Sequence, residues 1–157
     1  MQRTQEKERA FTRFVKETEP KLSHAFYAAY GPETGADVTS EALEYAWGHW
    51  DRVRGMENPA GYLYRVGQSR ARWYHRPRVV FPPVAAGMGD RGFEPALPGA
   101  LGALSRNQRI AVVLIYAFEW TEQEVADLLG ISRSSVRTHL ERGLARLQSS
   151  LGVRVDG

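Results

Sequence analysis

The sequence has no cysteine among its 157 residues. This excludes disulfide bonds, thiol nucleophiles and every zinc or iron–sulfur site built on cysteine ligands. The chain also lacks any apolar run close to the ~20 residues that a membrane-spanning helix needs. Its polar start, MQRTQEKERA, does not have the pattern of a signal peptide. We therefore expect a cytoplasmic protein that is not inserted into a membrane.

Catalytic motifs are missing as well. The four histidines are never three or four residues apart, there is no HExxH pattern, and no glycine-rich loop follows a strand. The acidic pairs fall on helix faces or in capping turns, where a solvated position explains them. We expect no catalytic activity, no metal and no cofactor.

Lysine is scarce, since 18 of the 21 basic residues are arginine. The net charge of +3 averages over segments of opposite sign: −2 for residues 1–50, +5 for 51–80, −3 for 81–130 and +3 for 131–157. The planar guanidinium of arginine binds phosphate and guanine through two parallel hydrogen bonds. Two separate basic segments therefore indicate two contacts with a polyanion such as nucleic acid.

Apolar residues recur at helical spacing from Phe11 to Tyr74, and no segment shows sustained strand alternation. Turn signals at 31–35 and 55–59 predict three or four helices in this part. Residues 77–99 then hold five of the eight prolines and four glycines, a composition that disfavours a helix. We predict an all-α protein of two small helical domains, 8–76 and 100–152, joined by a flexible Pro/Gly-rich linker at 77–99.

The second domain carries the most specific pattern. Ser105 and Thr121 each begin a capping box, and the first of these helices should bury Ile110, Val113, Leu114, Ala117 and Phe118. Gly130 suits the left-handed end of the short second helix, and Ser132 caps the next one. These signals predict a helix-turn-helix whose last helix exposes arginines and hydroxyls to a DNA major groove. A helical hairpin with a solvated arginine face is the alternative.

The first basic segment, GYLYRVGQSRARWYHRPR, interleaves aromatic residues with arginine. Rings and guanidinium planes stack on unpaired bases, while arginine follows the phosphates. A solvated basic helix with some aromatic residues in the core is the alternative, and Trp47 and Trp50 themselves suit a core.

The chain resembles the extracytoplasmic-function group of bacterial RNA polymerase sigma factors, within the sigma-70 family. Three segments carry the resemblance, in the family's order: GADVTSEALEYAWGHWDRV, NPAGYLYRV and the segment from Leu104 to Leu147. The resemblance implies a region 2-like domain at 8–76, which binds core polymerase and the −10 promoter element. It also implies a region 4-like helix-turn-helix domain at 100–152, which binds the −35 element. Promoter DNA and core RNA polymerase are the implied partners, an anti-sigma factor is a further one, and the free chain is expected to be a monomer.

The resemblance also assigns residues. Those that contact core polymerase are Asp37, Glu41 and Trp47. Those that contact the −10 element are Trp50, Arg52, Arg54, Asn58, Tyr64, Arg65, Gln68, Arg72, Trp73 and Arg76. Those that contact the −35 duplex are Thr121, Arg133, Ser134, Ser135, Arg137, Thr138 and Arg142.

Three positions depart from the family pattern: Ser40 replaces a usual Gln, while Ser69 and Trp73 replace a usual Asn and Asp. They bear on the strength of core binding and on base preference. The last helix also resembles the DNA-binding domain of response regulators, so a dimeric helix-turn-helix regulator is the alternative function. That alternative leaves NPAGYLYRV and the first basic segment without a role.

Overall fold

The computed structural model describes residues 1–72, 81 and 96–152, and within these ranges every regular element is helical. The N-terminal helices are α1 (Gln2–Tyr30), α2 (Pro32–Gly48), α3 (Trp50–Val53) and α4 (Pro59–Ala71). The C-terminal helices are α5 (Leu97–Ala103), α6 (Arg106–Val112), α7 (Glu122–Leu129) and α8 (Arg133–Leu151), with a π-helical turn, η2 (Val113–Ala117), after α6. The predicted all-α class is confirmed for the described residues.

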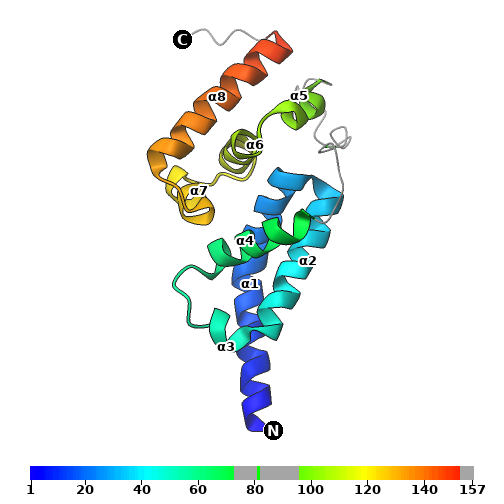
Figure 1. Ribbon diagram of the computed structural model, residues 1–157, viewed down its shortest axis with the longest axis vertical. Helices are drawn as coiled ribbons and strands as arrows, with labels where there is room; N and C mark the ends of the chain where they lie inside the picture. Colours follow the sequence, from blue (N-terminus) through cyan, green and yellow to red (C-terminus); the bar gives the residue numbers. More distant parts are fainter. Residues whose placement is uncertain (73–80, 82–95, 153–157) are drawn as a thin grey trace.

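Helix α1 is the axis of the N-terminal half, and its first turns extend beyond the other helices (Figure 1). Gly31, at φ 84°, ends α1, and Pro32 begins α2 directly afterwards. Pro lacks a backbone N–H and therefore suits the first helical position. Helix α4 crosses the pair at Gly67, where an added Cβ would clash with the ring of Phe26. This close crossing buries Phe26 and Leu63 completely.

The buried side chains form one main cluster that includes residues of both halves, such as Phe26 and Leu63 of the N-terminal helices and Ile110, Leu114 and Val136 of the C-terminal part. The C-terminal helices lie across the C-terminal end of α1 (Figure 1). A satellite cluster of Leu104, Val112 and Leu147 holds α8 against α6. The two halves are therefore packed together in this structure.

Two local expectations were wrong. Helix α5 begins at Leu97, inside the segment predicted as linker, because Pro98 lies in its first turn, where proline is tolerated. Ala117 was expected to face the core but is exposed. Ala117 is the last residue of the π-helical turn η2, whose wider repeat changes its angular position from that of a regular α-helix, whereas Phe118 still packs against the core. Of the rest of the predicted linker, residues 77–80 and 82–95 lie outside the described residues.

Candidate nucleic-acid interface

The helix-turn-helix forms as its capping signals predicted. Thr121 Oγ1 accepts from the Glu124 N–H, and the Glu124 carboxylate accepts from the Thr121 N–H, which completes a capping box. Gly130 ends α7 in the left-handed region at φ 69°, and Ser132 Oγ accepts from the Ser135 N–H to begin α8. The Thr121 hydroxyl is thus engaged in holding α7 in place.

The outer face of α8 carries the residues expected to meet the −35 duplex. Arg133, Ser134, Arg137, Thr138 and Arg142 are exposed, whereas Ser135 is half-buried. The hydroxyls are partly engaged within the helix: Ser132 Oγ lies 3.0 Å from Ser134 Oγ, and Thr138 Oγ1 donates to the Ser134 carbonyl at 3.0 Å. The arginines are the side chains of this face with the greatest reach.

Arg137 is held by Glu122, the first residue of α7. Arg137 Nε donates to one carboxylate oxygen of Glu122 at 3.1 Å, and Nη2 donates to the other at 3.2 Å. The hydrogen bond from Arg137 lowers the pKa of Glu122, and the same bond raises the pKa of Arg137. Spacing alone could not reveal the pair, because the two residues are 15 positions apart on different helices.

The loop before α4 is bounded by Val53 and Pro59. Asn58 caps α4, because its Oδ1 accepts from the Gly61 N–H at 3.1 Å. Its Nδ2 donates to the Asp127 carbonyl of α7 at 2.8 Å. The amide expected at the −10 element is therefore engaged with the helix-turn-helix in this structure.

Two residues expected at the −10 element are buried in this structure. Trp50 is 5% exposed and packs against Phe11 and Phe14, with ring centroids 5.3 and 5.1 Å away. Tyr64 is 1% exposed and stacks on Phe26, and burial raises the pKa of its hydroxyl. The helical period turns both rings into the core in this arrangement.

The remaining basic residues of this region face solvent. Arg52, Arg54, Arg65 and Arg72 are exposed, and Gln68 is half-buried with its Nε2 donating to Tyr64 Oη at 3.5 Å. Arg65 approaches the helix-turn-helix, since a Cβ added at Gly130 would lie 3.3 Å from its Nη1. Trp73 and Arg76 lie outside the described residues.

The residues expected to bind core polymerase lie on α2. Asp37 is exposed and Glu41 is half-buried. Trp47 is 39% exposed, a large fraction for this residue type, and packs on Phe11 with ring centroids 5.0 Å apart. Lys7 Nζ lies 4.5 Å from the centre of the indole ring. An acidic residue and a partly exposed tryptophan thus belong to the same helix.

Arg109 joins the two halves, and nothing in the sequence pattern marked it. Its side chain is buried, with 4% of the residue exposed. Nε donates to the Ala28 carbonyl at 2.8 Å, Nη2 to the Ala29 carbonyl at 2.7 Å, and Nη1 to the Leu104 carbonyl at 3.0 Å. Two of these carbonyls belong to the last turn of α1, where a cation also meets the negative end of the helix dipole.

A second contact between the halves involves His24 of α1. Its ring stacks on Phe118 with centroids 3.9 Å apart, and Trp120 Nε1 lies 3.4 Å from its Nδ1. In this pair the indole N–H donates and the neutral Nδ1 accepts. Burial lowers the pKa of His24, while Glu19 opposes the shift.

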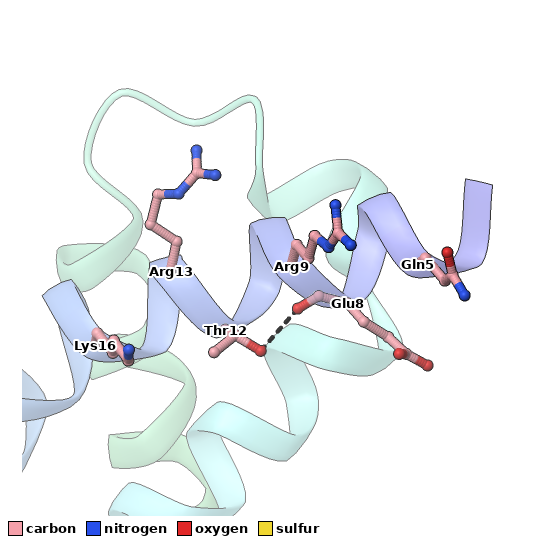
Figure 2. A pocket seen from close by; sticks show the side chains of 6 residues that line it. All are labelled: Gln5, Glu8, Arg9, Thr12, Arg13 and Lys16. Atoms are coloured by element: carbon pink, nitrogen blue, oxygen red, sulfur yellow. Dashed lines mark hydrogen bonds between the residues drawn. The ribbon is translucent and has the colours of Figure 1, made fainter. Parts of the chain in front are cut away.

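A shallow hollow runs along the exposed N-terminal part of α1. Figure 2 shows the side chains that line it, which all come from this one helix: Gln5, Glu8, Arg9, Thr12, Arg13 and Lys16. Within the hollow, Thr12 Oγ1 donates to the Glu8 carbonyl at 2.8 Å. Among the residues that the structure describes, only α1 lines the hollow. The hollow is therefore a solvated helix face and does not form a binding site.

The fold and the basic face of α8 define a helical DNA-binding protein of the helix-turn-helix class. Residues 96–147 match the family described as sigma-70, region 4. The chain is 30% identical over 132 residues to the RNA polymerase sigma-E factor of Streptomyces avermitilis. This alignment covers 78% of this chain and 74% of that protein. It is 29% identical over 132 residues to the protein of the same name from Streptomyces coelicolor, covering 78% and 75%.

Two solved structures are similar in fold, each with a TM-score of 0.63. One is the sigma factor RpoE in complex with the anti-sigma factor NepR from Bartonella quintana, at 20% identity, covering 93% of this chain and 99% of that one. The other is CnrH in complex with the cytosolic domain of CnrY, at 25% identity, covering 94% and 91%. The chain belongs to the extracytoplasmic-function group of sigma-70-family RNA polymerase sigma factors. Because the match to relatives covers 132 residues, it extends well beyond the helix-turn-helix that the regulator alternative explained.

Proposed function

We propose that this chain directs bacterial core RNA polymerase to promoters by binding the −35 element as duplex and the −10 element as a melted strand. The observation that carries the proposal is the pairing of a helix-turn-helix, with its basic face exposed, and a second basic surface on α4 and the loop before it. Each surface has the chemistry of a different DNA form. Duplex readout needs a helix in a groove, whereas a single strand needs exposed cations that follow its phosphates.

On α8, the N-terminal residues are the ones that a recognition helix presents to base edges. Arg133 and Arg137 lie four positions apart, on one face, so both enter the same groove. Arg142 lies further along the helix, where the DNA backbone is the nearer target. Ser134, Ser135 and Thr138 contribute short hydroxyls between them.

The −10 surface uses the exposed cations of the loop and of α4: Arg52, Arg54, Arg65 and Arg72. Asn58 ends the loop, and its Nδ2 becomes available to a base once α7 is displaced, while its Oδ1 continues to cap α4. Trp73 and Arg76, which the family resemblance assigns to the −10 element, lie outside the described residues. Trp50 and Tyr64 act from beneath as core residues that fix the loop and the helix.

Asp37, Glu41 and Trp47 form the surface for core polymerase. A partly exposed tryptophan on the same helix as two carboxylates fits an interface with an apolar anchor and charges that select a basic partner. The domain division at 8–76 and 100–152 assigns this surface and the −10 surface to one unit and the −35 surface to the other.

Promoter binding also requires a change from the arrangement described above. Asn58 donates to the Asp127 carbonyl, and Arg65 lies beside Gly130. A DNA strand that enters the loop must displace α7 from it. We propose that the halves separate in the promoter complex, with residues 77–99 connecting them, so that each unit raises the effective concentration of the other at its promoter element.

The remaining expectations follow from this function. The chain carries out no catalysis of its own, needs no metal or cofactor, acts in the cytoplasm and is a monomer when free. An anti-sigma factor is a fitting partner, because the similar structure of RpoE from Bartonella quintana contains the anti-sigma factor NepR. Among the helices of residues 1–72 and 96–152, none is long and apolar enough to span a membrane.

The test is selection of DNA by the holoenzyme. Purified core polymerase is mixed with the full chain, and co-elution on a sizing column is followed by selection from a randomised promoter pool. We expect a stable complex that enriches two spaced motifs. A chain that ignores core polymerase but binds a palindromic duplex as a dimer would favour the response-regulator alternative.

A further inference from the structure

The ion pair between Glu122 and Arg137 joins the two helices of the helix-turn-helix on the face proposed to meet DNA. Glu122 is the first residue of α7, and Arg137 is the fifth residue of α8. The contact has two parallel hydrogen bonds, at 3.1 Å from Nε and 3.2 Å from Nη2. The side chains remain 27% and 55% exposed, so the pair is accessible to a ligand.

A guanidinium has two edges that can each make a pair of parallel hydrogen bonds. One edge consists of Nε and one Nη, and the other consists of the two Nη groups. Glu122 occupies the first edge. The second edge is left for a ligand, and it is the edge that matches O6 and N7 of guanine in a major groove.

We propose that Glu122 is a positioning residue that sets the base specificity of Arg137. It holds the guanidinium so that the two Nη groups face a guanine in the −35 duplex. It also restrains Arg137 from swinging to a phosphate, because that movement breaks both hydrogen bonds to the carboxylate. This inference rests on the proposed function of α8.

The alternative is an ion pair that serves stability alone. Exposed pairs contribute little to stability and are screened by salt. Fixing a long side chain before it binds, in contrast, removes rotamer entropy that would otherwise oppose every contact with the base. The negative charge of Glu122 also repels phosphate. The residue therefore lowers the affinity for DNA of any sequence while it favours discrimination between bases.

The test uses the holoenzyme and a duplex selected by the wild-type chain from a randomised pool, together with its single-base variants. In Glu122→Gln, we expect the preference for guanine at the position read by Arg137 to fall about threefold to tenfold, a substantial part of what one bidentate contact supplies. Affinity for unrelated DNA should rise, because a negative charge has been removed. Preferences at the other positions should stay unchanged.

Glu141 provides the matched control. It is an exposed acid on α8 whose charge raises the pKa of Arg137, and it is not the hydrogen-bond partner of its guanidinium. Glu141→Gln removes the same charge from the neighbourhood of Arg137 without freeing its Nε edge. We expect the guanine preference to persist in this variant. An equal loss in both variants would assign the effect to charge alone and overturn the positioning role.

A double-variant comparison separates specificity from folding. When Arg137 is already Ala, the additional change Glu122→Gln should not alter base preference, and thermal melting should show that the Thr121–Glu124 capping box still holds α7. Guanine preference unchanged by Glu122→Gln in the wild-type background would overturn the role of Glu122 and leave the proposed function standing. A wild-type holoenzyme that selects no sequence would overturn both.

Discussion

Replacing Arg109 by Met removes the guanidinium that joins the C-terminal helices to α1 and keeps an unbranched side chain in its place. Three hydrogen bonds are lost, two of them to α1 at 2.7 and 2.8 Å. The carbonyls of Ala28 and Ala29 lose a charged donor at the end of a helix. Burial lowers the pKa of Arg109 from its ordinary value, so part of the stabilisation is offset by the cost of desolvating the guanidinium.

The magnitude follows from two opposing contributions. Hydrogen bonds to a charged group stabilise by about 1.5–3 kcal/mol each, so the two bonds to α1 contribute about 3–6 kcal/mol. Part of this stability loss is offset, because the variant no longer buries a charge. Arg109 has carbonyls and not a carboxylate as partners, so its burial carries a desolvation cost that Met avoids. We expect the free energy of unfolding to fall by about 2–4 kcal/mol.

Urea unfolding followed by circular dichroism measures this change, and small-angle X-ray scattering of the folded variant reports whether the halves separate. We expect a larger radius of gyration for Arg109→Met. Arg142→Met is the matched control, because Arg142 is exposed and its loss should leave both quantities unchanged. A loss of stability below about 0.5 kcal/mol, the usual limit for a surface substitution, with an unchanged radius would refute the assignment of Arg109 as the joining residue.

Further predictions concern the core-binding surface, the two kinds of DNA contact and the effect of pH. Replacing both Asp37 and Glu41 by Lys should weaken the complex with core polymerase by roughly 2–4 kcal/mol in calorimetric titration, with helicity unchanged. Full affinity in this variant would show that neither residue contacts core polymerase. Arg137→Ala should relax preference at one −35 base pair about tenfold to a hundredfold. Arg142→Ala should instead weaken all duplexes alike and reduce the salt slope by about one unit; fluorescence anisotropy on duplex variants distinguishes the two patterns. Because burial lowers the pKa of His24 below its ordinary value of 6.5, neutral His24 stabilises the fold fully above pH 6.5, and this contribution is lost as pH falls through the folded-state pKa. His24→Gln should flatten the pH dependence of the urea midpoint between pH 7.5 and 5, and an unchanged slope would contradict the assignment.

Local signals predicted the helix-turn-helix well because its elements are specified by neighbouring residues. Capping by Thr121 and Ser132 and the left-handed Gly130 each depend on a few adjacent positions, and all three are confirmed. The π-helical turn after α6 escaped prediction because its residues are ordinary apolar helix formers.

Contacts between the halves could not be predicted for a different reason. Arg109 precedes Ile110 on a helix whose capping and apolar face are complete without it, so its sequence context fits a solvated arginine. Its partners are backbone carbonyls about 80 positions away, and carbonyls have no residue signature. The sequence favoured a core position for Trp50, which is confirmed, but it left Tyr64 open, because an aromatic residue beside arginines fits both a core position and a stacking surface.

The most direct test of the central claim is promoter-dependent transcription by core polymerase reconstituted with this chain. Templates are drawn from a genomic promoter library, and start sites are mapped for the wild-type chain, Arg137→Ala and core polymerase alone. The account predicts defined start sites with the wild-type chain, each preceded by two spaced motifs, and reduced use of those sites with Arg137→Ala. Start sites no different from those of core polymerase alone, with the wild-type chain folded and present in excess, would contradict it.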